Sequence, residues 1–428
     1  MRYGFILILL ACGCSHVANR TVAQTSNPIF QCMEPLSKSH YMTSRDCFLK
    51  NEKNFLDKSN QTFFDQNMAT VFSYAGEEEK ARQIFDRINT NISPRDTIDT
   101  SHYDLKNASD EIVKRVKDRQ ILLINEAHHV PQTRLLTLQL LKPLYAQGYR
   151  YLAAEAFNSQ TIDEVIHNGF PTQELGTYVA EPTYSLMVRE ALKIGFKLVA
   201  YDAFPNCDPF HEAPEKCQNL REAAQAQNLF EQIFKNDPRA KVIVHVGYGH
   251  LDKKGGDGDW SWIPMGKYLW QLTQIEPFSV DQTFFFERGR PDLNSTLYEQ
   301  VSSTYNLKTP AVLIERETKA PFVYTKYQNH YDMQVFLPKI NLKKDRPSWK
   351  SDLPLIRMTN LKEFHCPPQH ECLVQAILKS ELKRNFIPVD QTILLGHKAA
   401  LYLLPGSYEI RLVDEQDAIL STRSFLVH

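Results

Sequence analysis

The sequence lacks an excess of charge of either sign. Its 49 lysines and arginines nearly balance 50 aspartates and glutamates, which leaves a formal net charge of -1 at pH 7. Binding to nucleic acid or to an anionic membrane surface depends on clustered positive charge, so this balance gives no reason to expect either partner. The chain has 428 residues, of which 43% are hydrophobic, and this predicts two or three domains with a sizeable core.

Long apolar runs are also missing beyond the N-terminus, so no segment there is expected to cross a membrane. The first residues, MRYGFILILLACGCS, join Arg2 to a short apolar stretch and are typical of a secretory signal. LLAC at 9–12 resembles a bacterial lipobox, which predicts lipidation of Cys12, with Cys14 as the second choice. We therefore expect a lipid-anchored protein of the bacterial cell envelope that faces the periplasm or the outside.

Cysteine is scarce, and the six cysteines beyond the signal fall into local pairs. In an oxidising compartment disulfides are the default for such cysteines, and the local pairing is the expected one among 15 connectivities. The stretch HCPPQHEC at 365–372 leaves a zinc site as an alternative, although its spacing matches no standard zinc motif. The expected pairs are Cys32 with Cys47, Cys207 with Cys217, and Cys366 with Cys372.

The remaining pattern predicts an α/β protein with a central, mostly parallel sheet flanked by helices. Short apolar runs at 120–124, 151–154, 197–201 and 241–246 read as buried strands. The first two enclose a leucine-rich stretch that Pro131 begins and Gly148 ends, as in a βαβ unit. This domain is expected at 99–340, after a signal and tether at 1–19 and a helical segment at 20–98.

Two smaller regions flank that domain. Residues 65–88 place apolar residues at helical spacing around Gly76, like one tetratricopeptide unit. Because such units are stabilised by stacking, a helical cap on the next domain is the favoured interpretation. Residues 341–428 contain short strands separated by Pro-Gly and Asp-Glu turns, which predicts a small β-sandwich-like domain without a catalytic constellation.

Each predicted strand of the α/β domain is followed by an acid or a histidine. Parallel strands direct their carboxyl ends to one edge of the sheet, where ligands bind, so we expect these groups to form a cleft. The alternative is a set of surface loop residues or strand-end caps. The residues are Glu126 with His128 and His129, Glu155, Asp202 and His250.

The local context suggests roles for some of these groups. The loop at 125–130 leads into the start of a helix, whose dipole favours an ionised Glu126 and a neutral histidine. A neutral imidazole can act as a general base on water, and one histidine of the doublet is expected to be functional and the other structural. Arg221 falls in the first turn of a helix capped by Asn219, where a cation is disfavoured. We expect it to reach a carboxylate or a developing oxyanion, with a solvated surface arginine as the alternative.

Two loops border the expected cleft. A disulfide between Cys207 and Cys217 would hold its rim. The glycine-rich GGDGDW at 255–260 is interpreted as a lid or turn. Calcium binding by Asp257 and Asp259 is the alternative there, although an EF-hand loop needs more oxygen ligands.

The motifs NEAHH, AAEAF, REALKIGFKLVAYDA, REAAQAQNLFEQIFKNDPRAKVIVHVGYGHL and IPMGKYL occur in an order that resembles the erythromycin-esterase-like and ChaN-like proteins. That superfamily also includes the TraB and Tiki proteins, and the resemblance covers roughly 115–275. HVGYGH is closer to the ChaN and TraB style than to the esterase pattern Trp-Ala-His-Asn-x-His.

The resemblance implies a set of site residues. The family's Gly-Glu-x-x-His motif maps onto Glu126 and His129, with Asn125 in place of the glycine, and its second acid maps onto Glu155. Its Arg-x-x-x-Met-Ala helix maps onto Arg221, with Gln225 in place of methionine, and its closing Gly-His onto Gly249 and His250.

The resemblance also implies three functions that the sequence leaves open. Esterase members activate water with the glutamate and histidine, Tiki members are metal-dependent proteases, and ChaN members are lipoproteins linked to haem and iron uptake. The favoured hypothesis is a hydrolase of a small-molecule or peptide substrate, with Glu126 and His129 activating water and His250 and Arg221 stabilising an oxyanion. In this hypothesis Glu155 orients a histidine or holds a divalent metal. The alternatives are a haem- or iron-binding lipoprotein with a histidine or Tyr248 as ligand, and a scaffold with a vestigial site.

Overall fold

The computed structural model describes residues 27–56, 60–88, 95–207, 213–255, 262–353, 356–382 and 385–428. The expected lipidation at Cys12 and the expected lid residues Asp257 and Asp259 lie outside these ranges. Within these ranges no helix combines the length and the apolar character that crossing a bilayer requires.

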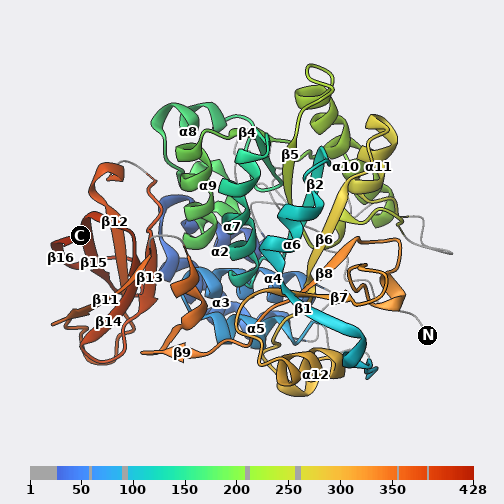
Figure 1. The fold of residues 1–428 in the computed structure, drawn as a ribbon. Helices are drawn as coiled ribbons and strands as arrows, with labels where there is room; N and C mark the ends of the chain where they lie inside the picture. Colours follow the sequence, from blue (N-terminus) through green and yellow to red (C-terminus); the bar gives the residue numbers. More distant parts are fainter. Residues whose placement is uncertain are drawn as a thin grey trace.

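The centre of the molecule is an eight-stranded sheet with the strand order β1-β7-β8-β6-β2-β5-β3-β4 (Figure 1). The strands from β8 to β4 pair in parallel, whereas β7 and β1 complete one edge in antiparallel pairing. The predicted fold class is confirmed. The strands are β1 (Tyr103–Asn107), β2 (Ile121–Glu126), β3 (Tyr151–Ala154), β4 (Lys197–Ala200), β5 (Val242–Gly247), β6 (Phe278–Phe285), β7 (Ala311–Glu315) and β8 (Met333–Phe336).

The four apolar runs of the sequence form four adjacent strands, β2 to β5. Every residue of β2 and β5 is buried, as expected for strands covered on both faces. Helix α7 begins directly after Pro131 and ends before Gly148, whose φ of +92° is a left-handed conformation that favours glycine. The helices of this domain are α6 (Ala108–Arg115), α7 (Gln132–Ala146), α8 (Ile162–Asn168), α9 (Pro182–Ile194), α10 (Pro214–Leu229), α11 (Met265–Thr273) and α12 (Thr296–Thr304).

The N-terminal segment is helical and packs as a cap. Helices α4 and α5 turn at Gly76, which has a φ of +83°. Their apolar core continues into Ala180 of the α/β domain and into Leu373 and Val413 of the C-terminal region. These contacts bury the apolar surface that a neighbouring unit would cover in a stack of repeats. The helices are α2 (Pro28–Met33), α3 (Tyr41–Phe55), α4 (Gln61–Tyr74) and α5 (Glu78–Phe85).

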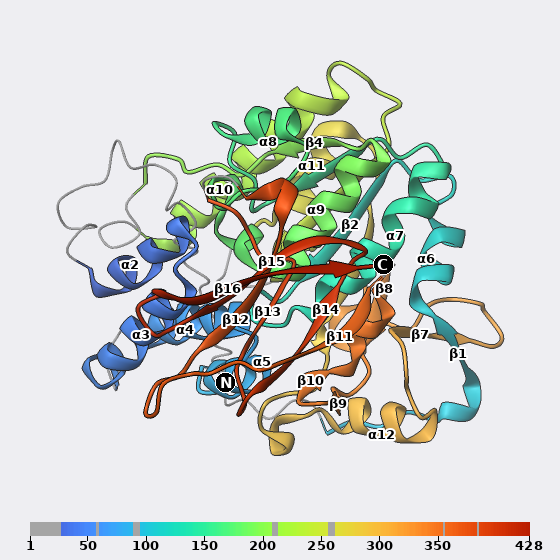
Figure 2. The same ribbon diagram turned by 90° about the vertical axis from the view of Figure 1, so that its left-hand side faces the viewer.

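The C-terminal region forms small antiparallel sheets at one side of the molecule, as predicted (Figure 2). One sheet has the order β13-β12-β15-β16, β11 pairs with β14, and side chains of both sheets share one apolar core. The strands are β9 (Leu342–Lys343), β10 (Arg346–Pro347), β11 (Arg357–Lys362), β12 (Leu373–Leu378), β13 (Asp390–Ile393), β14 (Lys398–Leu403), β15 (Gly406–Val413) and β16 (Ile419–Val427).

Buried polar contacts join the three regions. Arg346 pairs with Asp390 at 2.6 Å inside the C-terminal region, and the indole N–H of Trp349 donates to Glu78 of α5 at 3.2 Å. Arg189 of α9 pairs with Glu381 at 2.6 Å, with both side chains buried. Removing one member of such a pair leaves a buried charge without compensation, so these contacts fix how the regions pack.

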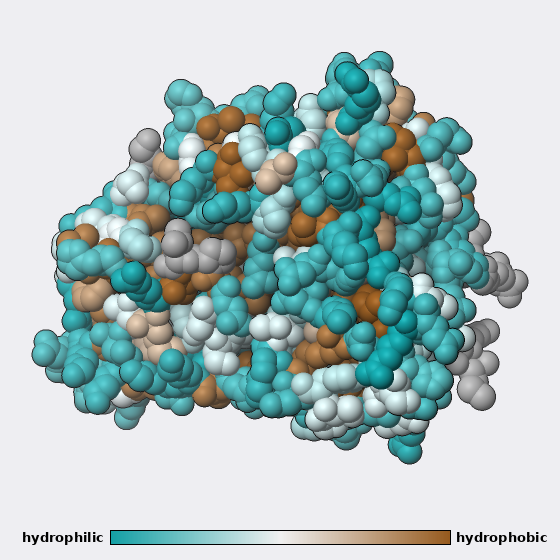
Figure 3. Space-filling view, viewed as in Figure 1, coloured by the Kyte–Doolittle hydropathy of each residue, from teal (hydrophilic) through white to brown (hydrophobic). Residues whose placement is uncertain are grey.

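The three local disulfides are present as predicted, between Cys32 and Cys47, Cys207 and Cys217, and Cys366 and Cys372. The last of them excludes the zinc interpretation of HCPPQHEC, because its two sulfurs are bonded to each other. Disulfides of this kind are typical of proteins from oxidising compartments. On the face shown in Figure 3, hydrophilic side chains predominate and hydrophobic ones appear as separate patches.

Candidate active site

The predicted polar residues meet at the carboxyl ends of four adjacent strands. Glu126 is the last residue of β2 and lies opposite Gly247, the last residue of β5. Glu155 directly follows β3, Asp202 follows β4 by one residue, and His250 lies in the short helix η7 (Tyr248–Leu251) after β5. The parallel topology therefore brings them to one edge, in two groups.

The first group is centred on the carboxylate of Glu126. One oxygen accepts a hydrogen bond from Nδ1 of His128 at 2.8 Å, and the other is bound by Nε of Arg134. Arg134 is fully buried and also donates to Glu181 at 2.8 Å and to the main-chain oxygen of His128 at 3.0 Å. Burial alone would raise the pKa of Glu126, but the guanidinium of Arg134 and the nearby imidazoles of His128 and His245 lower it well below its usual value.

These contacts fix the tautomer of His128. An ionised carboxylate only accepts hydrogen bonds, so Nδ1 of His128 carries a proton, and in the neutral form of this ring Nε2 is the acceptor. The ring stacks on Tyr178 with centroids 3.7 Å apart, and the residue is only 4% exposed. Nε2 is buried and has no hydrogen-bond partner among the described residues. A buried acceptor in this state is suited to receive a proton.

His129, the histidine expected to act with Glu126, points elsewhere. Its Nδ1 lies 3.0 Å from the hydroxyl of Tyr248, and its ring stacks on Phe85 of α5 with centroids 3.7 Å apart. Burial, with Arg288 and His128 nearby, lowers the pKa of His129 well below its usual value. The geometry therefore favours His128 as the partner of Glu126 and gives His129 the structural place in the doublet.

The second group is centred on Arg221. Its Nη2 donates to Glu155 at 2.7 Å and to Asp202 at 2.9 Å, and Nε donates to Asp202 at 3.0 Å. Arg221 thus reaches carboxylates rather than solvent. Gln225, which replaces the family's methionine, donates to Asp202 at 2.6 Å.

The expected start of this helix was wrong. Helix α10 already begins at Pro214, a residue that suits a first helical turn, so Arg221 lies in its middle. Asn219 therefore caps nothing here, and its side chain accepts from the main-chain N–H of Ile263 at 2.8 Å.

His250 lies between two acids of the second group. Its Nδ1 is 2.7 Å from Glu222 and its Nε2 is 3.4 Å from Glu155. Glu222 also accepts from the indole N–H of Trp262 at 3.2 Å and from the main chain of Met265 at 2.6 Å. Burial would lower the pKa of His250, but the two carboxylates raise it above its usual value, which favours the imidazolium.

The protonation of the two acids beside Arg221 differs. Burial would raise the pKa of Glu155, but His250 and Arg221 lower it to about 2. Burial also raises the pKa of Asp202, and there it outweighs the attraction of Arg221. Glu155 therefore carries the firmer negative charge of the pair.

Gly247 is where the two groups meet. Its N–H donates to Glu155 at 2.6 Å. A Cβ atom at this position would lie 2.7 Å from Nε2 of His128 and 2.9 Å from the same carboxylate of Glu155. Nε2 of His128 and the carboxylate of Glu155 are thus both close to the position that the side chain of any residue other than glycine would occupy.

Several residues of the site were not predicted. Arg134 binds Glu126 and is itself bound to Glu181, Glu222 holds His250, and Nε2 of His245 lies 3.6 Å from Glu126. A histidine inside the apolar run KVIVHV was a usable signal for His245. Arg134 and Glu181 carry no local signal, because their role depends on the packing of α7 against the start of α9.

The residues do not fit a metal site, and two of the candidate haem ligands are engaged by other side chains. In the part of the chain that the structure describes, no three histidine, cysteine, aspartate or glutamate side chains are grouped so that they could hold a metal ion. Arg221 occupies the position between Glu155 and Asp202 that a cation would take. The hydroxyl of Tyr248 is engaged by His129, whose ring is packed against Phe85, so neither presents an open axial ligand for haem.

Comparisons with known proteins give no family. No protein-family model matches the chain, and no curated protein matches it. Among solved structures, bacterial protein toxins match at 16% identity and a TM-score of 0.31, over 51% of this chain and 45% of theirs. The type III effector HopBA1 matches at 15% identity and a TM-score of 0.31, over 44% and 90%. The RRSP effector domain of a MARTX toxin from Vibrio vulnificus matches at 18% identity and a TM-score of 0.29, over 45% and 40%.

The chain spans less than half the length of the first of these structures. Likenesses with TM-scores near these values are too loose to support a conclusion about activity. The proposed function therefore rests on the geometry of the site.

Proposed function

We propose that this protein is a hydrolase that cleaves an ester or amide bond with a water molecule activated by His128. The observation that carries the proposal is the buried, unpartnered Nε2 of His128, whose Nδ1 is held by an ionised Glu126. The resemblance of residues 115–275 to erythromycin-esterase-like and ChaN-like proteins supports the same class of chemistry. Esterase members of that superfamily activate water with the equivalent glutamate and a histidine.

In the proposed reaction His128 is the general base. A water molecule between Nε2 of His128 and the substrate carbonyl gives its proton to the ring as its oxygen attacks the carbonyl carbon. The carboxylate of Glu126 stabilises the resulting imidazolium, and Arg134 keeps that carboxylate ionised and in place.

His250 is the proposed proton donor. Its raised pKa favours the protonated form, which can stabilise the oxyanion and then protonate the leaving group as the tetrahedral intermediate collapses. Glu155 and Glu222 position its ring. Arg221 is shared by two carboxylates, so its proposed role is to hold Glu155 rather than to bind the oxyanion directly.

The test compares the two neighbouring histidines. Hydrolysis of a panel of p-nitrophenyl esters and peptide amides is measured for the wild type, His128→Ala and His129→Ala. A general base contributes ~10²–10⁴-fold in rate, so we expect His128→Ala to lower kcat by that factor and His129→Ala to lower it less. Equal losses in the two variants would contradict the assignment, and a wild type inactive on every substrate would contradict the proposed function.

The proposed location is the bacterial cell envelope, with a lipid anchor at Cys12. The three disulfides fit an oxidising compartment, and the lipobox-like LLAC supports the anchor. The haem-binding lipoprotein is not retained as a second function, because Tyr248 and His129 are engaged with each other.

A further inference from the structure

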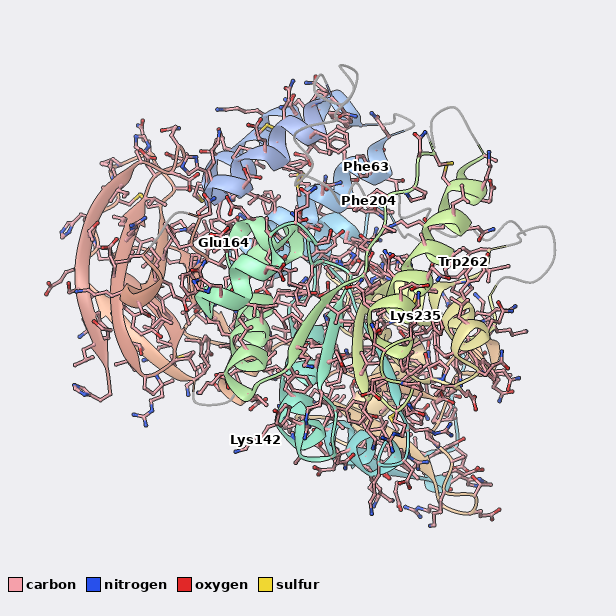
Figure 4. All side chains as sticks on the ribbon, turned by 90° about the horizontal axis from the view of Figure 1, so that it is seen from above. Phe63, Lys142, Glu164, Phe204, Lys235 and Trp262 are labelled. Atoms are coloured by element: carbon pink, nitrogen blue, oxygen red, sulfur yellow. A yellow bond between two sulfur atoms is a disulfide. The ribbon has the colours of Figure 1, made fainter. Side chains whose placement is uncertain are left out.

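An aromatic ring is exposed directly above the buried charges of the site. Phe204 is 53% exposed and lies on the segment that leads from β4 toward α10 (Figure 4). Its ring lies over the guanidinium of Arg221, with 5.8 Å between the guanidinium carbon and the ring centroid. The same guanidinium is bonded to Glu155, which lies 3.4 Å from Nε2 of His250, so Arg221 and Glu155 connect Phe204 to the proposed proton donor.

A second aromatic side chain borders the same centre. Trp262 is half-buried, and its indole N–H is bonded to Glu222, the residue that holds His250. A Cβ atom on Gly249 would lie 2.9 Å from the distal edge of the indole, which places Trp262 over the segment that carries His250.

Both aromatic side chains are held in place. The segment after Phe204 is joined to α10 by the disulfide between Cys207 and Cys217. Asp202, two residues before Phe204, is bonded to Arg221. The residue after Trp262 is bonded through its main chain to Asn219 of α10. Rigid apolar surfaces of this kind bind a ligand at a lower entropic cost than mobile ones.

The charges of the site restrict which ligand those surfaces can take. Arg221 is neutralised by Glu155 and Asp202, and Arg134 is neutralised by Glu126 and Glu181. The two arginines thus have no positive charge to spare for an anionic ligand, and Glu222 offsets the positive charge of the protonated His250. An uncharged ligand is therefore favoured over a phosphate or carboxylate ester.

We infer that Phe204 and Trp262 form an apolar subsite for the acyl or aryl group of an uncharged ester or amide substrate. This inference rests on the proposed function and names the substrate class of the same site. The apolar group packs on the two rings, and its carbonyl is directed toward His128 and His250.

The first measurement is a specificity ratio. Hydrolysis of p-nitrophenyl phenylacetate, acetate and hemisuccinate is compared in the wild type, Phe204→Ala and Leu426→Ala. Leu426 is a matched control, because it is an exposed apolar residue of β16 in the C-terminal region. We expect the wild type to prefer phenylacetate over acetate and to disfavour hemisuccinate. Loss of an apolar contact is worth ~10-fold or more, so Phe204→Ala lowers the phenylacetate-to-acetate ratio of kcat/KM by that factor, whereas Leu426→Ala leaves the ratio unchanged.

The second measurement needs no turnover. Binding of two neutral ketones, 4-phenyl-2-butanone and 2-butanone, is followed by ligand-observed NMR. Preferential binding of the aryl ketone that Phe204→Ala weakens ~10-fold supports the subsite even if no ester is hydrolysed, in which case only the proposed function fails. Hydrolysis without a preference for the aryl ester, or equal binding of the two ketones, overturns the subsite and leaves the proposed function standing.

Discussion

The substitution Gly247→Ala tests how closely the two halves of the site meet. Gly247 has a φ of -81° and a ψ of 141°, an extended conformation that alanine adopts without strain. The effect of the new methyl group is therefore steric. It would lie 2.7 Å from Cε1 and Nε2 of His128 and 2.9 Å from a carboxylate oxygen of Glu155, and real Cβ atoms essentially never approach other atoms this closely.

Neither neighbour of that methyl group moves freely. The ring of His128 is held by Glu126 at 2.8 Å and stacked on Tyr178, and Glu155 is held by Arg221 at 2.7 Å. Overpacking of this kind costs ~1–3 kcal/mol of unfolding free energy. Because a displacement of about 1 Å in a catalytic group can lower the rate ~10²-fold, we expect activity to fall much further than stability.

The assay measures kcat/KM on the best ester together with urea-induced unfolding. Gly249→Ala is the matched control, because its methyl group would meet the distal edge of the Trp262 ring rather than His128 or Glu155, and its loss of kcat should be smaller. Gly247→Ala with wild-type kcat/KM would refute the argument that His128 and Glu155 converge at this position. If unfolding accounts for the whole loss of activity, the expectation that activity falls further than stability is wrong.

Further predictions concern His250, Arg134 and Cys12. Glu222 is the largest favourable influence on the raised pKa of His250, so Glu222→Gln should move the alkaline limb of the kcat–pH profile to lower pH, and an unmoved limb would contradict a protonated His250. The stability contributed by that raised pKa is present below the unfolded value of about 6.5 and is lost as pH rises through the folded value, so the destabilisation by Glu222→Gln should be largest at acid pH. Arg134→Met leaves Glu126 and Glu181 buried without a cation and should lower the unfolding free energy by ~3–5 kcal/mol in urea titrations, and a cost below ~1 kcal/mol would contradict this role. Mass spectrometry of the mature protein should find a lipidated Cys12 as its first residue, and an intact Met1 would contradict the anchor.

The sequence was sufficient for the centre of the sheet because burial on both faces leaves a clear pattern. β2 and β5 are mostly apolar, and every one of their residues is buried. β6 was not predicted, because it carries Asp281 and Gln282 in its middle. Both are buried and hydrogen-bonded to another strand, since Asn125 donates to Asp281 at 2.8 Å and Gln282 donates to the main chain of Asn125 at 2.7 Å. Polar residues whose hydrogen bonds form only in the folded state conceal a buried strand in the sequence.

The choice between the two histidines was not open to an argument from strand alternation. β2 ends at Glu126, and the chain then turns, since the main-chain N–H of Val130 donates to the carbonyl oxygen of Ala127 at 2.8 Å. The resemblance favoured the longer spacing of the family's motif. In the structure His128 binds Glu126 and His129 turns to Tyr248.

The contacts that the N-terminal helices make beside the candidate site also had no local signal in the sequence. Phe85 of α5 covers His129, and Asp86 pairs with Arg288 at 2.6 Å. A methyl group on Gly289 would lie 2.3 Å from the main chain of Gln83, so the cap and the α/β domain approach each other at backbone distance. The contacts of Arg288 and Gly289 join residues about 200 positions apart and leave no periodic pattern in either segment. Since His129 in turn holds Tyr248 beside the candidate site, the α/β domain bounded by sequence pattern alone would lack the side chain that packs on His129.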